Sequence, residues 1–198
     1  MTQEYRFPDW FFHQWPRTTL PLAFFLLLLS PVVSAGVDTA TCLIYLQLIA
    51  YLVHQYEEHA AGKFKEYANR LFGGGREVLG DAAIFWINVG GVWGVDLAAF
   101  YAAFYFGAPA GLVAVYLSLV NGVIHIGGAL KERTYNPGLW TGIGLFLPLG
   151  GFTLYEFAKA GHATAFQHMI GLGLAILIHA AIIAHVVANR RRLGIART

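Results

Sequence analysis

Long runs of apolar residues, separated by short polar segments, dominate the pattern of this chain. A membrane helix needs about 20 mostly apolar residues to cross about 30 Å of hydrocarbon, and each run is close to that length. The pattern predicts an all-α, polytopic membrane protein, a bundle of six transmembrane helices. The six runs cover approximately residues 20–36, 39–56, 81–106, 108–130, 138–157 and 164–189.

Composition supports the membrane interpretation. Hydrophobic residues make up 57% of the 198 residues and charged residues 12%, whereas soluble domains average about 45–50% and about 25%. A formal charge of +2 is too small to indicate nucleic acid. The glycine-rich segment at residues 72–77 lacks the Lys-Ser/Thr of a phosphate-binding loop, so no nucleotide cofactor is indicated. We expect one membrane domain over residues 1–198.

Basic residues predict the orientation, because lysine and arginine are retained on the cytoplasmic side. With the N-terminus inside, only Lys159 of the 13 basic residues lies outside. We therefore expect both termini in the cytoplasm, at the bacterial inner membrane. Residues 1–19 are predicted to form an interfacial aromatic tail, and residues 190–198 a basic tail that contacts membrane lipids.

Three histidines are expected at one depth in the membrane. His54, His125 and His179 lie 15, 17 and 15 residues after the outer ends of their predicted helices, at Thr39, Ala108 and Thr164. Asn88 reaches a similar level from the cytoplasmic side. At about 1.5 Å of rise per residue, these four side chains form a layer toward the cytoplasm, and we expect them to converge in one pocket.

Polar residues also share helix faces. The second helix carries a stripe of four polar residues within about 60° of one another, and the fourth helix carries a stripe that includes Asn121 and His125. Ionisable groups that face lipid are costly, so these stripes should face each other or a water-filled cavity. The stripe of the second helix comprises Gln47, Tyr51, His54 and Glu58.

Two adjacent carboxylates, Glu57 and Glu58, need neutralisation in such a place, and three interpretations are open. A divalent transition metal such as zinc, iron or manganese could bind them, because His at i with carboxylates at i+3 and i+4 is a helical ligand spacing. A protonated histidine could instead form a metal-free acid–base pair. Alternatively, residues 57–59 have reached the headgroup region and end the helix. The candidate metal ligands are His54, Glu57, Glu58, His125 and His179.

Two short motifs resemble those of a known family. The segment HQYEE at residues 54–58 matches the motif of the HXXEE-domain family of integral membrane proteins, and YNPG at residues 135–138 matches its YXPG motif. His125 stands in the place of a further histidine of that family. The resemblance implies a membrane-embedded protein without an assigned activity. It supports the choice of His54, Glu57, Glu58, His125 and Tyr135 as site residues.

The YNPG segment also has a local meaning. Pro137 disfavours helix at Asn136, and Gly138 tolerates a left-handed backbone, so the segment is predicted to form a tight turn before the fifth helix. The same turn would hold Tyr135 over the cytoplasmic mouth of the bundle. There its hydroxyl could meet a carboxylate or a substrate.

Two function classes follow. The first is a membrane-embedded enzyme, with Glu57, Glu58, His125 and Tyr135 as catalytic candidates, that acts on a small or lipid-like substrate through a metal or through paired proton transfer. The second is a small transporter coupled to protons or metal that uses the same residues. For an enzyme, we expect aromatic and aliphatic side chains such as Phe100, Tyr101 and Phe104 to seal the outer half of the bundle.

Overall fold

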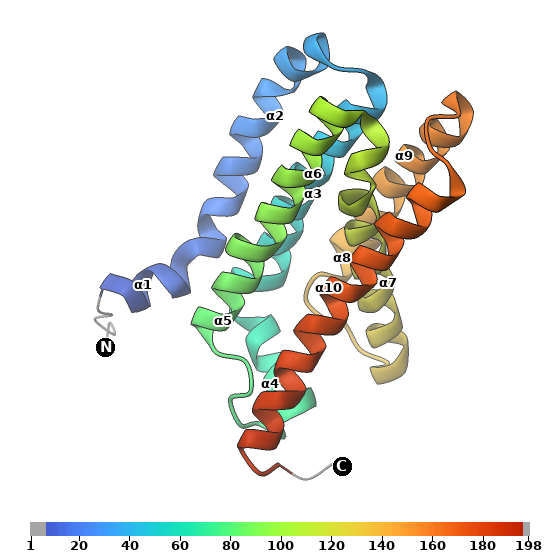
Figure 1. Cartoon of the computed structure of the whole chain (residues 1–198). Coiled ribbons are helices and arrows are strands. Elements are labelled where there is room, and N and C mark those ends of the chain that lie inside the picture. Colours follow the sequence, from blue (N-terminus) through green and yellow to red (C-terminus); the bar gives the residue numbers. More distant parts are fainter. Residues whose placement is uncertain (1–6, 196–198) are drawn as a thin grey trace.

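The chain folds into a bundle of helices joined by short loops. The computed structural model describes residues 7–195, and the regular elements in that range are all helical (Figure 1). The fold class is therefore all-α. The elements are α1 (Phe7–Gln14), η1 (Trp15–Thr18), α2 (Thr19–Gly36), α3 (Thr39–His59), α4 (Lys63–Gly73), α5 (Asp81–Phe85), η2 (Trp86–Val92), α6 (Trp93–Phe106), η3 (Ala108–Gly111), α7 (Leu112–Glu132), α8 (Leu139–Thr141), η4 (Gly142–Phe146), α9 (Leu147–Ala160) and α10 (Ala165–Arg192).

These elements join into six long helical runs that coincide with the six apolar stretches of the sequence. Four of the runs are long and apolar enough to cross a membrane, which indicates a membrane protein. They are Trp10–Gly36, Asp81–Phe106, Ala108–Glu132 and Ala165–Arg192. The other two runs are α3, which carries several buried polar residues such as Gln47, His54 and Glu58, and the continuous run α8–η4–α9.

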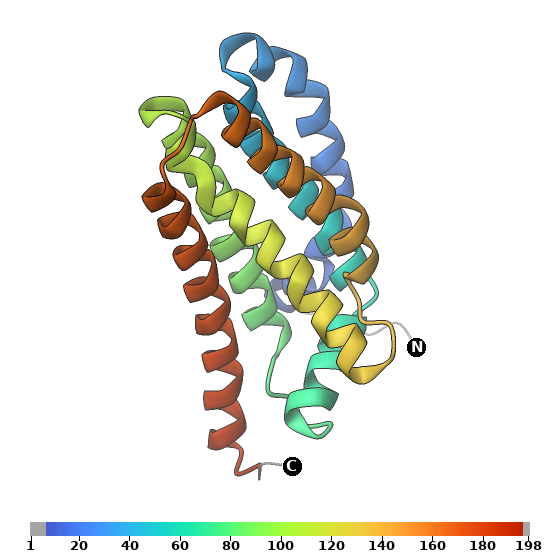
Figure 2. The same cartoon turned by 90° about the vertical axis from the view of Figure 1, so that its right-hand side faces the viewer.

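Helix α3 is the central helix of the bundle. Of its 21 residues, 15 are buried, and it packs against α2, α6, α7 and α9. Helices α2 and α10 lie at the periphery (Figures 1 and 2) and expose apolar side chains such as Phe25, Val32 and Leu177. Polar residues on α3 therefore meet other helices, whereas α2 and α10 present the surface expected for contact with lipid.

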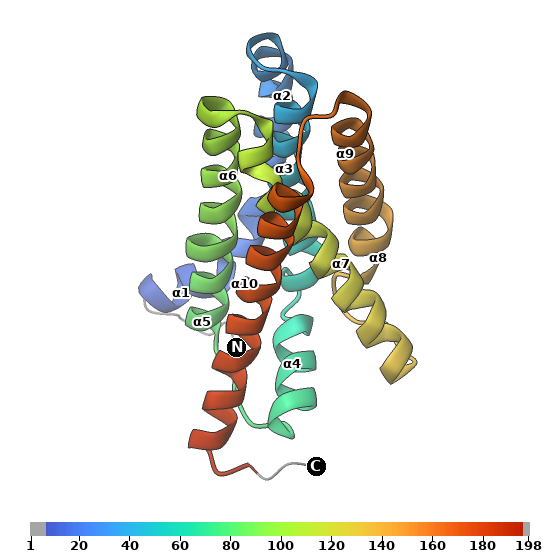
Figure 3. The ribbon, with the colours of Figure 1, turned by 45° about the vertical axis from the view of Figure 1, so that its right-hand side comes forward.

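Helix α4 marks one end of the bundle, here called the α4 end. The C-terminal part of α10 reaches the same end, and α1 lies at an angle to α2, near the N-terminal end of α2 (Figures 1 and 3). Helix α4 forms in a polar segment for which the sequence pattern predicts no element. Gly62 and Gly74 bound it with positive φ angles, and its buried Ala68 packs against Val78 and Leu79.

An apolar cluster closes the opposite end. It comprises Ala40, Ile44, Ala99, Ala103, Ala108, Leu112, Ala114, Val115 and Phe157. Of the three aromatic residues named for the predicted seal, only Phe100 packs against this cluster, because Tyr101 and Phe104 are each 51% exposed. Alanine on α6 lets the helices approach closely, so small and aliphatic residues together with Phe157 fill this end, and the rings of Tyr101 and Phe104 lie at the surface.

Two short π-helical segments interrupt the long runs. η2 holds Asn88, and η4 begins directly after Thr141. Such segments are rare and often occur near functional sites, because the extra residue in the turn rotates the side chains that follow. Both segments lie beside α3 at the level of its polar stripe, since Gln55 contacts Asn88 and His54 contacts Thr141.

Candidate metal centre

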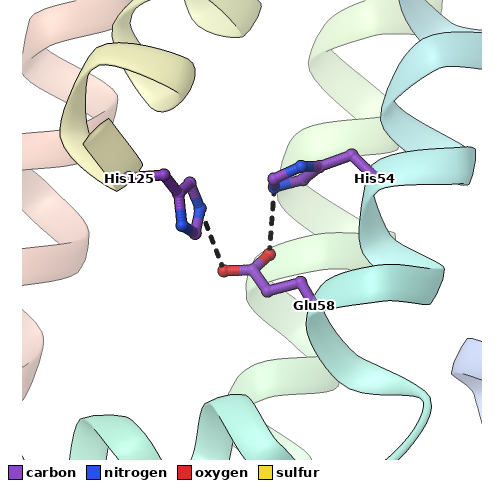
Figure 4. A group of neighbouring side chains, drawn as sticks. All are labelled: His54, Glu58 and His125. Atoms are coloured by element: carbon purple, nitrogen blue, oxygen red, sulfur yellow. Dashed lines mark ion pairs between the residues drawn. The ribbon is translucent and has the colours of Figure 1, made fainter. Parts of the chain in front are cut away.

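Three buried side chains from two helices converge near the α4 end. His54 and Glu58 are one turn apart on α3, and His125 comes from α7 (Figure 4). The His54 Nε2 atom lies 3.4 Å from Glu58 Oε2, and the His125 Nε2 atom lies 3.5 Å from Glu58 Oε1. One ligand atom from each residue falls within 4.8 Å of the others, so the group could hold a metal ion.

The hydrogen bonds of His54 fix its ring proton on Nδ1, the nitrogen that faces away from Glu58. The Thr141 hydroxyl donates its one proton to an acceptor, either Glu57 Oε2 at 2.5 Å or the Gly138 carbonyl at 3.4 Å. Its oxygen is then an acceptor for the His54 Nδ1–H, 2.8 Å away. A neutral His54 with its proton on Nδ1 carries a lone pair on Nε2, and that lone pair faces Glu58.

His125 is held in the same tautomer by a different partner. Asn136 donates its amide Nδ2 to the His125 backbone carbonyl at 2.8 Å, which orients the amide group. The Asn136 Oδ1 atom must therefore accept from His125 Nδ1–H, at 2.7 Å. The Nε2 lone pair of His125 thus also points toward Glu58.

Two lone pairs and one carboxylate facing a common point repel one another unless a cation or a proton lies between them. The His54 Nε2 atom is fully buried, and the described part of the chain supplies it with no hydrogen-bond partner. Metal-binding histidines usually donate their other ring N–H to an oxygen of the protein, as both histidines do here. Two imidazoles and one carboxylate are a common ligand set for zinc and for non-haem iron.

Glu57 lies outside this group, although it was predicted as a ligand. It accepts hydrogen bonds from the backbone N–H groups of Trp140 and Thr141, at 3.1 and 2.7 Å, and from the Tyr135 hydroxyl at 2.8 Å. These amides belong to the first turn of α8, where a carboxylate is favoured by the helix dipole. Burial and the neighbouring carboxylate raise the pKa of Tyr135 to about 12. Adjacent carboxylates on α3 therefore have different partners.

The YNPG turn forms as predicted and packs directly on the histidines. Gly138 has a φ of +97°, and a Cβ atom placed on it would lie 2.7 Å from the Cε1 atoms of both His54 and His125. Glycine is thus needed for the backbone conformation and for the close approach. The turn contacts the HQYEE segment at Glu57 through Tyr135 and at His54 through Gly138, and it contacts His125 through Asn136.

His59 was considered only as a helix-ending residue, but the structure buries it beside the group. Its Nε2 atom lies 3.1 Å from Glu58 Oε2, and its ring packs between Trp15 and Phe64, at centroid distances of 5.4 and 5.0 Å. Glu58 is only 6% exposed. Its burial among three histidines argues against the interpretation that residues 57–59 simply end the helix in the headgroup region.

The predicted layer of four residues is only partly brought together. His179 bonds through Nδ1 to its own helix, at the Ala175 carbonyl 2.8 Å away, and does not join the ligand group. Asn88 accepts from Gln55 at 2.9 Å and donates to the Ile84 carbonyl at 2.8 Å. It therefore braces a neighbouring face of α3. Counting depth placed these residues at the right level, but the rotation of each helix decides which side chains meet.

A second buried polar layer lies one turn further from the α4 end. Asn121, predicted as a site residue, contacts Tyr51 and has a buried Oδ1 atom without a hydrogen-bond partner. Gln47 Oε1 and both carboxyl oxygens of Asp96 are also buried without partners among the described residues. These four atoms are all side-chain oxygens, and no donor among the described residues reaches them.

Asn136 and Thr141, which orient the two histidines, were not predicted as functional residues. Asn136 occupies the variable position of the YXPG motif, and Thr141 lies in a segment without any motif. The only signal in the sequence was their position next to a turn that was expected to close over the site.

Comparison with known families gives one match. The family model described as "Protein of unknown function with HXXEE motif" matches residues 45–153. This range includes His54, Glu58, His125 and the YNPG turn, whereas α1, α2 and α10 lie outside it. No curated protein and no solved structure matches the chain.

Proposed function

Because this chain belongs to the family of proteins of unknown function with an HXXEE motif, we propose a function from its site: it is a metal-dependent, membrane-embedded enzyme. His54, Glu58 and His125 are the metal ligands. The substrate is a small or lipid-like molecule that reaches the site from the α4 end.

The proposed topology has six spans, with the α4 end and both termini in the cytoplasm. Helix α3 crosses the membrane surrounded by other helices, which explains why it is less apolar than the four runs named above. The run α8–η4–α9 crosses at the periphery and exposes apolar side chains such as Phe152 and Tyr155. Lysine and arginine residues cluster on α4, at the end of α7 and at the end of α10, whereas Lys159 stands alone at the opposite end. The bacterial cytoplasmic membrane is the proposed location.

One observation carries the metal assignment: both histidines direct Nδ1 to fixed oxygen atoms and turn their Nε2 atoms toward one carboxylate. Zinc, iron or manganese bound there would keep open positions and supply an activated water or oxidant. The protein's own part is to orient the ligands. Thr141 and Asn136 set the tautomers, Glu57 anchors the first turn of α8, and Tyr135 covers Glu57.

The closed opposite end favours an enzyme. A transport route needs polar groups along its whole length, but the core between Ala40 and Leu112 is apolar at that end. A proton- or metal-coupled transporter is a second candidate, favoured by Asp96. This carboxyl group is fully buried on α6, and neither of its oxygens has a hydrogen-bond partner among residues 7–195. Such a group in a membrane interior commonly serves proton or cation movement.

Reconstituted vesicles can separate the two candidates. Purified protein loaded with zinc, iron or manganese is placed in vesicles of bacterial lipids, and lipid products are followed by mass spectrometry while proton and metal flux are recorded. The proposal expects metal-dependent conversion of a membrane component, lost in Glu58→Gln and kept in the peripheral control Gln167→Ala. Flux that Glu58→Gln or Asp96→Asn abolishes, without conversion of any lipid, would establish the transporter instead.

A further inference from the structure

A groove at the α4 end reaches His59, the residue next to the candidate metal ligand Glu58. It has a volume of about 680 Å³, within the range of small-molecule sites. The N-terminal segment forms one wall with Phe12 and Trp15, and α4 forms the other with Lys65 and Arg70. His59 also lines the groove, and its Nε2 atom lies 3.1 Å from Glu58. One side chain therefore contacts both the groove and the metal ligand.

Two arginines of the groove have no acidic partner among residues 7–195. Lys65 is paired, since its Nζ atom lies 2.9 Å from carboxylates of both Glu77 and Asp81. Arg17 and Arg70 are exposed and make no ion pair in the described part of the chain, and Arg70 rests against the ring of Tyr67. The three basic lining residues equal the three acidic ones, Glu66, Glu77 and Asp81, in number, so these residues give the groove no net positive charge. The two planar guanidinium groups are nevertheless free to bind an anion with several oxygens, such as a phosphate.

The surroundings of the groove favour an amphiphile. The exposed rings of Trp10 and Phe11 stand at the start of the apolar run Trp10–Gly36, where aromatic residues mark a membrane interface. Directly beyond them, α2 exposes apolar side chains such as Leu20 and Phe24. A molecule with its polar head in the groove can thus lay its chain along α2 within the hydrocarbon.

We propose that this groove binds the phosphate group of a membrane amphiphile, with Arg17 and Arg70 as the phosphate ligands, and that this amphiphile is the class of substrate presented to the metal centre. The second part rests on the proposed function, but binding in the groove does not. His59, which lines the groove and contacts Glu58, lies between the bound phosphate group and this metal ligand. The N-terminal segment, outside the matched family range, would therefore contribute to substrate recognition.

The test measures lipid binding by native mass spectrometry on the full chain in a neutral detergent. Phosphatidic acid and phosphatidylglycerol are compared with diacylglycerol, which lacks phosphate, and with inorganic phosphate. The variant Arg17→Gln/Arg70→Gln should lose about tenfold or more in affinity for both phospholipids, because it removes the charge-assisted hydrogen bonds to the phosphate. The control Lys131→Gln/Arg191→Gln removes two charges from the same end but outside the groove, and should change affinity less than twofold.

The outcomes distinguish the sources of the phosphate. Equal losses in the two double variants would overturn the groove and leave general surface attraction. Equal affinity for diacylglycerol would overturn the phosphate assignment, and inorganic phosphate bound as tightly as phospholipid would overturn the amphiphile. Arg17→Lys/Arg70→Lys should bind at an intermediate level, because it keeps the charge and loses the bidentate geometry.

Metal content of the same samples keeps this proposal separate from the proposed function. Arg17→Gln/Arg70→Gln should keep its metal, which also shows that it is folded. Glu58→Gln should lose its metal and still bind phospholipid. If wild type binds no metal but binds phospholipid through the two arginines, the groove stands and the enzyme proposal fails.

Discussion

Gly138 lies against both His54 and His125, so close that a Cβ atom would fall 2.7 Å from a ring carbon of each. The two halves of the site, one from α3 and one from α7, are therefore joined by the backbone of a turn. The HQYEE and YNPG segments act as one unit, because the second orients and covers what the first supplies.

Gly138→Ala should damage the centre in two ways. The added methyl would push both rings apart, and a φ of +97° is strained for alanine. We expect a lower melting temperature. We also expect metal affinity to fall at least about tenfold, because mutating groups that orient metal ligands commonly has an effect of this size. Gly151→Ala is the matched control, since nothing lies within 4 Å of its added Cβ. Normal metal binding by Gly138→Ala would show that the close approach has no role.

Asn136→Ala should weaken metal binding without removing a ligand. His125 would lose its Nδ1 partner and could rotate or change tautomer, and loss of such supports costs about 10–100-fold in affinity. Asn136→Asp keeps an acceptor for Nδ1 and should retain more affinity than Asn136→Ala. Metal titration monitored by calorimetry provides the comparison. Identical affinities for wild type and both variants would mean that His125 needs no orientation.

The two adjacent carboxylates should give opposite results when neutralised. Glu57→Gln removes a charge from the first turn of α8 and should lower stability by about 1 kcal/mol, with metal still bound. Glu58→Gln should lose the metal, because a ligand is replaced. Thermal unfolding and metal content of the two variants are measured together. Metal loss in Glu57→Gln with retention in Glu58→Gln would reverse the assignment.

The Tyr135 hydroxyl should lose its proton at a higher pH than an ordinary tyrosine. Its pKa is raised to about 12 by burial and by the Glu57 carboxylate. The protonated phenol donates to Glu57, so its contribution to stability is complete below about pH 10, the usual tyrosine value, and is lost as pH rises through 12. The phenolate absorbance of wild type minus Tyr135→Phe should show this step, and the step should move toward pH 10 in Glu57→Gln. A step near pH 10 in wild type would mean that the contact is not maintained.

Much of the fold and of the ligand group could be predicted from the sequence. Apolar runs located six helices, because the cost of burying charge in hydrocarbon leaves a strong pattern. Counting depth from the helix ends placed His54 and His125 together, since helical rise is regular. The same count included His179 and Asn88, which the structure turns to other partners. Rotation about each helix axis depends on packing with neighbours and is not contained in a depth count.

Distinguishing Glu57 from Glu58 was beyond the sequence for a related reason. The two are 100° apart on α3, and the identity of the group that each meets depends on where α8 begins. His59 was missed because its packing partner, Trp15, comes from the N-terminal segment, far away in the chain. Asn136 and Thr141 became visible as supports only when their hydrogen bonds to the histidines could be traced.

The central claim is that His54, Glu58 and His125 hold a divalent metal, and elemental analysis of the purified protein tests it most directly. Wild type should carry close to one equivalent of zinc, iron or manganese, or acquire it on incubation. His54→Ala, Glu58→Gln and His125→Ala should each lose it, and His179→Ala should keep it. Wild-type protein that stays free of metal after incubation with all three ions would contradict the account.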